Sequence, residues 1–161
     1  MDGLWERISS YNIFNNLFPG ALFVYLFERA SHVVLSTEDI VKNIVLYYFL
    51  GLVLGRLGSI IIEPLFKLFK LVKFAPYDKF VAASKLDSKI DVLQEVANMY
   101  RTLFTVSVVM LVSLYLMSKV TGGNYILSQI ACSLFALLFI ISYVKQIRYI
   151  VRRINKLTEL P

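Results

Sequence analysis

The chain has 161 residues, of which 58% are hydrophobic, and a formal net charge of +6. A soluble domain of this length is usually about 45–50% apolar, so an ordinary soluble domain is excluded. Together with the mean hydropathy of +0.67, this indicates a single membrane domain over residues 1–161. The one cysteine, Cys132, excludes a disulfide within the chain and a cysteine metal site.

Four membrane-spanning helices are predicted, and the first two form a hairpin. The first span covers about 13–35, with Pro19 tolerated near its start. It reads as a retained span, because a charged leader and a clean cleavage site for a signal peptide are missing. A re-entrant half-span is the alternative. The second span covers about 40–62 and is expected to end at Glu63, because the residue before Pro64 is pushed away from helix.

A connector over 63–101 follows, and its first part is an apolar stretch with a basic stripe. Lys67, Lys70 and Lys73 recur every three residues, so we expect them to share one broad face of a helix. Such a helix suits the headgroup region of an anionic leaflet, which makes membrane lipids the expected contact. Direct nucleic-acid binding is not expected, because lipid explains the aromatic residues better.

A second connector helix is predicted over 85–101, after the break at Pro76. Asp87, Asp91 and Glu95 recur every four residues and form an acidic ridge. The ridge is either a solvated face or a contact for a cytosolic protein partner or a neighbouring subunit. No Pro or Gly separates this helix from the third span, about 102–118. A turn leads to the fourth span, about 125–144, and a basic tail covers 145–161.

The basic residues predict the orientation of the hairpins. With the N-terminus in the cytoplasm, thirteen of the 17 Lys and Arg residues lie on the cytoplasmic side. These thirteen are Arg7, Lys67, Lys70, Lys73, Lys79, Lys85, Lys89, Arg101, Lys145, Arg148, Arg152, Arg153 and Lys156. We therefore expect a multi-pass membrane protein with both termini and the connector in the cytoplasm.

An intramembrane polar cluster is the main candidate site. Arg56 lies about 10 Å inside the inner boundary and two helical turns before Glu63, so the two are expected on one side of the second span. Three readings stay open: simple snorkelling of Arg56, a cluster that holds the helices in register, and the lining of a water-filled or ion-conducting path. The other members are Asn12, Asn15, Asn16, Asn98 and Arg101.

Glycines in the second span suggest close helix packing. Gly51 and Gly55 form a small-xxx-small pair, and Gly58 follows. We expect a homo-oligomer packed partly through this face. The sequence has no phosphate-cradling glycine loop, no paired intramembrane carboxylates and no Ser/His/Asp set, so we expect no enzyme activity, no cofactor and no bound metal.

Four segments resemble a known group of small four-span bacterial membrane proteins from antiphage defence islands. They are SYNIFNNLFPGALF, GRLGSIIIEPLFK, KFAPYDKFVAASK and EVANMYRTLF. The membrane subunit of the Kiwa system falls in the same broad functional category. The resemblance covers about residues 8–120 and carries no individual functional residue. It implies an oligomeric inner-membrane effector or sensor in antiviral defence, controlled by a cytosolic partner. The alternatives are a small transporter or channel, and a membrane anchor that recruits a soluble partner.

Overall fold

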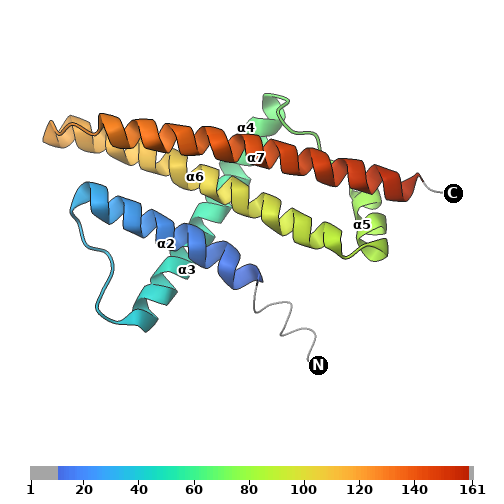
Figure 1. Cartoon of the computed structure of the whole chain (residues 1–161), viewed down its shortest axis with the longest axis horizontal. Coiled ribbons are helices and arrows are strands. Elements are labelled where there is room, and N and C mark those ends of the chain that lie inside the picture. Colours follow the sequence, from blue (N-terminus) through green and yellow to red (C-terminus); the bar gives the residue numbers. More distant parts are fainter. Residues whose placement is uncertain (1–10, 160–161) are drawn as a thin grey trace.

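The computed structural model describes the chain from residue 11 to residue 159, with side chains from residue 15 onward. This part of the chain is all-α (Figure 1). It contains α2 (Tyr11–Ser31) and a continuous helix made of α3 (Ile40–Leu57), a π-helical segment (Gly58–Ile62) and α4 (Glu63–Leu68). Three further helices follow: α5 (Tyr77–Leu86), α6 (Lys89–Thr121) and α7 (Ile126–Thr158).

Within residues 11–159, three helical segments are long and apolar enough to cross a membrane. They are Ile40–Leu68, Lys89–Thr121 and Ile126–Thr158, and only 17% of the most apolar windows of the first and third is buried inside the protein. Leu127 and Leu134 on α7 are 81% and 62% exposed. So much exposed apolar surface is unfavourable in water but favourable in the hydrocarbon core of a membrane. These segments contain the second, third and fourth predicted spans.

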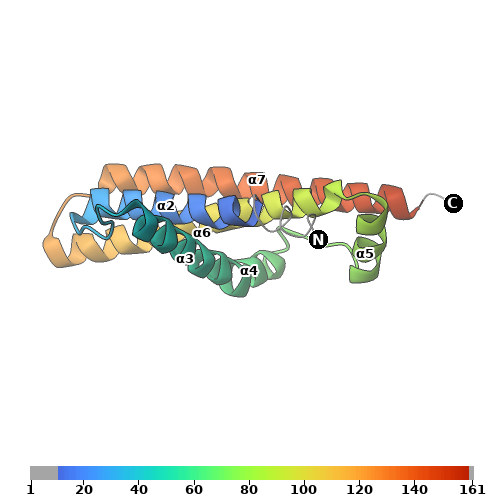
Figure 2. The same cartoon turned by 90° about the horizontal axis from the view of Figure 1, so that it is seen from below.

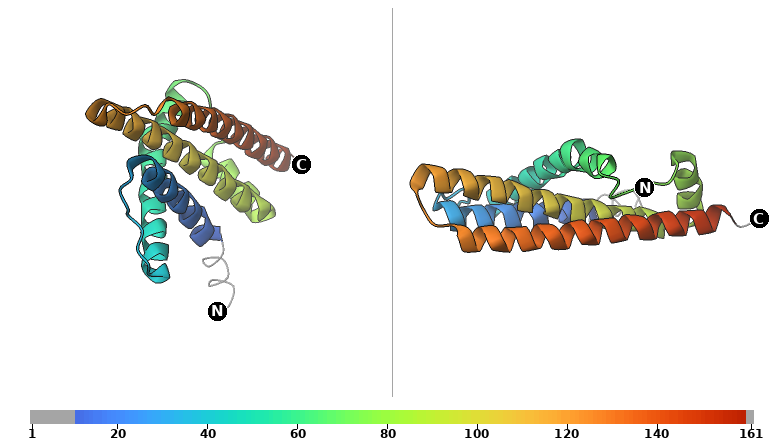
Figure 3. Two further views of the ribbon diagram at one scale, coloured as in Figure 1. Left: turned by 60° about the vertical axis from the view of Figure 1, so that its left-hand side comes forward. Right: turned by 90° about the horizontal axis from the view of Figure 1, so that it is seen from above.

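Helix α2 overlaps the first predicted span but is not among these three segments. It has 21 residues and ends at Ser31, short of the predicted end at residue 35. Asn15 and Asn16 lower its hydropathy, as do Pro19 and Gly20. Figure 3 shows α2 beside α3 and α6, with α3 crossing them steeply.

Helices α6 and α7 form an antiparallel hairpin that extends well beyond its apolar part (Figures 1 and 2). Each has 33 residues and is about 50 Å long, against about 30 Å for the hydrocarbon core of a bilayer. The charged ends, 89–101 and 145–158, lie together, and α5 packs against them. We call α5 and these two charged ends the stalk. The 122–125 turn and the 32–39 loop lie toward the opposite end (Figure 2).

Two hydrophobic cores hold the molecule together. One lies between α3 and the apolar part of the hairpin, and includes Leu54 of α3 with Val106 and Met110 of α6. The other begins at Tyr143 and continues along the stalk. Its members from α7 are Tyr143, Ile147, Ile150 and Ile154, which recur at helical spacing on one face. The predicted basic tail is therefore a continuation of α7 with a buried apolar stripe.

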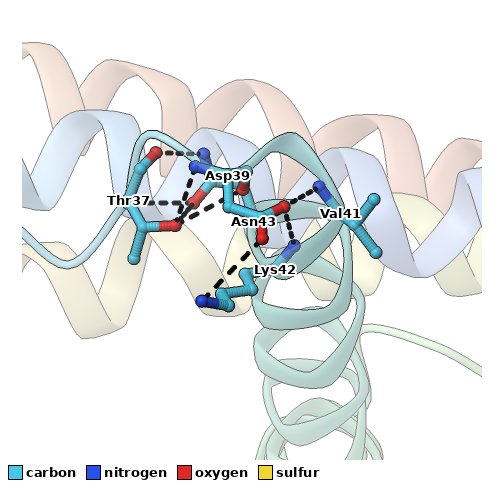
Figure 4. A network of polar contacts seen from close by, with 5 residues as sticks. All are labelled: Thr37, Asp39, Val41, Lys42 and Asn43. Carbon is cyan, nitrogen blue, oxygen red and sulfur yellow. Dashed lines mark hydrogen bonds and ion pairs between the residues drawn. The ribbon is translucent and has the colours of Figure 1, made fainter.

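A polar network fixes the start of α3 (Figure 4). Asp39 caps the helix, and its Oδ1 accepts from the backbone N–H of Val41 at 2.9 Å and of Lys42 at 3.3 Å. The Asn43 Nδ2 donates to the carbonyl oxygen of Thr37 at 2.8 Å, and the Thr37 N–H donates back to the Asn43 Oδ1 at 2.8 Å. These bonds tie the loop to the helix and explain why the helix begins at the predicted residue.

The connector differs from the expected pair of helices. Glu63-Pro64 does not end the second span, because a π-helical turn lies directly before Pro64 and the helix runs on to Leu68. Proline fits poorly in a regular α-helix, and π-helical turns are one way in which a helix adapts its hydrogen bonding. The single predicted helix over 85–101 is divided by Asp87, whose extended backbone ends α5 and whose Oδ1 accepts from the N–H of Lys89 at 3.1 Å.

Candidate functional site: a polar groove at the helix crossing

An open groove of about 860 Å³ lies between α2, α3 and α6. One part of its wall is apolar and includes Ile44 and Leu52. Most of the predicted polar cluster lines the same groove. These polar residues are Asn15, Asn16, Arg56, Asn98 and Arg101. Asn12 belongs to the first turn of α2, but its side chain lies outside the described part of the chain. The groove therefore offers amide and guanidinium donors beside an apolar wall.

Arg56 and Glu63 are not partners, contrary to the expectation from helical spacing. The π-helical segment between them holds more residues per turn than an α-helix, and the Glu63 N–H donates to the carbonyl oxygen of Gly58, five residues earlier. Seven residues therefore do not complete two turns here, and the two side chains face different neighbours. Arg56 is exposed on the groove, and among the described residues its side chain has no hydrogen bond or ion pair.

Glu63 instead forms an ion pair with Arg101 of α6. The Arg101 Nη1 donates to the Glu63 Oε2, and the side chains are 12% and 20% exposed, respectively. The Lys67 Nζ lies 2.9 Å from the other Glu63 oxygen. Breaking such a largely buried pair leaves a charge that is only partly compensated by Lys67, which costs more than losing an exposed pair. The pair therefore fixes the end of the α3–α4 helix to α6 at the base of the stalk.

Two buried donors beside this ion pair lack described partners. They are the Arg101 Nε and the Tyr143 hydroxyl. The ring of Tyr143 is fully buried, and its centroid lies 5.6 Å from that of Phe66 in α4. Tyr143 was not predicted, because it lies in an apolar run and resembles a core residue.

The predicted glycines bring helices together within one chain. A Cβ on Gly51 would lie 1.8 Å from the backbone oxygen of Asn16, and one on Gly20 would lie 1.8 Å from that of Tyr47. Helices α2 and α3 therefore touch backbone to backbone. Gly58 faces Thr105 of α6 at 2.8 Å by the same measure. The glycine face on which we expected a second copy is therefore occupied by α2 and α6 of the same chain, and the homo-oligomer stays a prediction.

The predicted basic stripe of the connector is not a single helical face. Helix α4 ends at Leu68, and Lys70 has a positive φ of 56°. Lys67 pairs with Glu63, and its ammonium group lies 4.7 Å from the ring centroid of Phe74. Lys70 and Lys73 are exposed. Contact of these three lysines with lipid headgroups stays a prediction, but it does not rest on a shared helix.

The acidic ridge is divided among three environments. Asp87 accepts from the Arg153 Nε at 2.6 Å, and this bond holds its pKa below the usual value. Asp91 is exposed, with no described ion pair. Glu95 lines the polar groove, and burial, then the charge of Asp91, raise its pKa. Of the three predicted partner-contact residues, only Asp91 presents a free, exposed charge.

Comparison with protein-family models, with curated proteins and with solved structures finds no match. Within the described residues, no group of three or more His, Cys, Asp or Glu side chains is arranged to hold a metal ion. The polar side chains that line the groove, among them Arg56 and three asparagines, can supply positive charge and hydrogen bonds.

Proposed function

We propose that this protein is an inner-membrane effector or sensor of antiviral defence whose stalk contacts a cytosolic partner. The observation that carries the proposal is the continuity of α6 and α7, each an unbroken 33-residue helix that includes an apolar part and a charged part. A change imposed on the stalk would reach the membrane through rigid helices, without an intervening loop. The defence role itself rests on the resemblance of four sequence segments.

The contacts within the stalk support its role as one mechanical unit. Arg153 of α7 pairs with Asp87 at the junction of α5 and α6, and the Gln146 Nε2 donates to the carbonyl oxygen of Leu93 at 3.1 Å. Ile90 and Ala97 are fully buried against α7. A partner that binds one stalk helix would therefore act on all three.

Asp91 is the residue with which to test the partner contact, because its charge is exposed and free of described ion pairs. We expect Asp91→Lys to lose phage protection in cells that also express the neighbouring genes. Glu38→Lys is the matched control, because it makes the same charge change in the exposed loop at the opposite end. Membrane levels of both variants are measured alongside plating efficiency. Full protection by Asp91→Lys would remove this face as the contact, and lack of protection by the wild type would overturn the defence role.

A channel or transporter is the second candidate, and the open groove beside Arg56 favours it. An exposed guanidinium group near the apolar segments would attract anions or water into the groove. Flux through proteoliposomes in the absence of any partner separates this function from the first. Constitutive flux that Arg56→Leu abolishes would favour the channel or transporter. Proteoliposomes that show no flux would favour the effector or sensor.

A further inference from the structure

A row of basic side chains follows directly on the apolar part of α7. Residues 126–144 contain no charged residue. Lys145, Arg148 and Arg152 then recur three and four residues apart, which places them on one face of the helix. The row therefore begins where the uncharged segment ends, at the level expected for lipid headgroups.

A groove of about 610 Å³ runs along this row. Its charged rim is formed by Lys145, Arg148 and Arg152. Its wall toward the apolar segment is formed by Ile140, Ile141, Val144 and, from the turn after α4, Leu71. The groove thus changes along its length from apolar to cationic, which is the pattern complementary to an amphipathic anion.

The three cations lack protein partners, unlike other basic residues near them. Among the described residues, the side chains of Lys145, Arg148 and Arg152 make no ion pair or hydrogen bond, and all three are exposed. Arg101 and Arg153, by contrast, each pair with a carboxylate. Three uncompensated positive charges on one face favour an anionic ligand over a neutral one.

A tight turn builds the second wall of the groove. Lys70 adopts the left-handed conformation with φ 56°, and the N–H of Leu71 donates to the carbonyl oxygen of Phe66 at 2.9 Å. This is the bonding of a Schellman motif, in which glycine usually occupies the left-handed position. A lysine there is strained, and strain of this kind is common at ligand sites. The turn brings Leu71 against α7 and places a further cation beside it in sequence.

We propose that this groove binds one anionic phospholipid. The phosphate lies against Arg148 and its two basic neighbours, since a guanidinium group can donate two parallel hydrogen bonds to phosphate oxygens. An acyl chain lies over Ile141 and Val144. The proposal rests on the membrane placement of α7 but on neither the defence role nor the cytosolic partner, so those parts of the proposed function can fail independently of it.

Native mass spectrometry of the purified full chain in mild detergent tests the site. Phosphatidylglycerol and phosphatidylcholine with identical acyl chains are titrated separately. The test variant removes the three cations of the groove, and the control removes three exposed lysines elsewhere on the stalk. The test variant is Lys145→Gln, Arg148→Gln, Arg152→Gln, and the control is Lys79→Gln, Lys85→Gln, Lys156→Gln.

We expect the wild type and the control to bind one phosphatidylglycerol within twofold of each other, and the test variant to bind it about tenfold more weakly. Far-UV circular dichroism monitors folding. If the triple variant does not fold, Arg148→Gln alone is measured, with about a threefold loss expected. Equal binding by all proteins, equal loss in test and control, or no preference for phosphatidylglycerol in the wild type would overturn the site. Displacement of the lipid by soluble glycerol phosphate would assign the groove to a free phosphate and overturn it too. If the wild type forms dimers that the test variant does not form, and the wild type shows no preference for phosphatidylglycerol, the groove is an interface with a second copy. That result would overturn the lipid site.

Discussion

The contact between α2 and α3 gives the sharpest stability prediction. Gly51→Ala adds a Cβ that would lie 1.8 Å from the backbone oxygen of Asn16, whereas an ordinary contact begins near 3.4 Å. The obstacle is backbone and cannot rotate away. The helices must therefore move apart by about 1.5 Å at this point, which also disturbs the reciprocal contact of Gly20 with Tyr47.

The expected cost follows from two opposing effects. Overpacking of a close contact costs about 1–3 kcal/mol. The cost here belongs near the upper end of that range, because the backbones of α2 and α3 are in contact and neither can rotate away as a side chain could. Alanine is a better helix former than glycine by about 1 kcal/mol. We therefore expect Gly51→Ala to lower the free energy of unfolding by about 2 kcal/mol.

Gly55→Ala is the matched control on the same helix. Its nearest atom, the Thr102 Oγ1, would lie 3.5 Å from the new Cβ, which is an ordinary contact. We expect Gly55→Ala to be neutral or more stable by up to about 1 kcal/mol. The assay is unfolding by sodium dodecyl sulfate in mixed micelles, followed by far-UV circular dichroism. Equal stability of Gly51→Ala and Gly55→Ala would refute the close approach of α2 and α3.

Three further predictions concern charges. Arg101→Leu leaves Glu63 paired only with Lys67 and should lower the free energy of unfolding by about 3 kcal/mol. Adding Glu63→Leu should recover part of this cost. Strictly additive effects of the two substitutions in the same assay would argue against coupling between them. The Arg153 bond lowers the pKa of Asp87 from its usual 3.8, so the pair stabilises the stalk above that pH and its contribution is lost as the pH falls through the lowered pKa. Asp87→Asn should therefore destabilise the stalk at neutral pH and make the thermal unfolding temperature depend less on acid pH. An unchanged dependence on acid pH would contradict this. Arg56→Leu should preserve membrane level but change activity, with Arg56→Lys only partly active; full phage protection or unchanged liposome leakage in both would leave Arg56 a simple snorkelling residue.

The long apolar segments could be predicted from the sequence because their signal is local. The start of α3 at Ile40 and the run of α6 from the connector into the third span both follow from composition and from the absence of Pro or Gly. The segregation of charge to 145–158 predicted a basic tail, but not that it continues α7 with a buried stripe of isoleucines.

The candidate site was predicted in composition but not in pairing. Asn15, Asn98 and Arg56 line one groove. The asparagines were predicted to lie at the level of Arg56 because they stand at the cytoplasmic starts of the first and third predicted spans. The pairing of Glu63 with Arg101 was not predicted, because a π-helical turn changes the direction of every side chain after it and leaves no signal in hydropathy. The partner of Gly51 was also unexpected, since a small-residue motif indicates close approach but not which helix approaches.

The basic row on α7 could have been found from its spacing alone. The intervals of three and four residues between Lys145, Arg148 and Arg152 place them on one face of a helix. The second wall, which turns this row into a groove, comes from Leu71, about seventy residues earlier in the sequence. Only the fold brings the two together.

We predict that the stalk lies in the cytoplasm and that the 32–39 loop lies on the other side of the inner membrane. Single cysteines at Glu38 and Lys85, both exposed, are introduced with Cys132→Ala and treated with a membrane-impermeant maleimide. We predict that Glu38→Cys is labelled in intact spheroplasts and that Lys85→Cys is labelled only after lysis. Labelling of Lys85→Cys in intact spheroplasts, or protection of Glu38→Cys until lysis, would contradict this orientation of the chain.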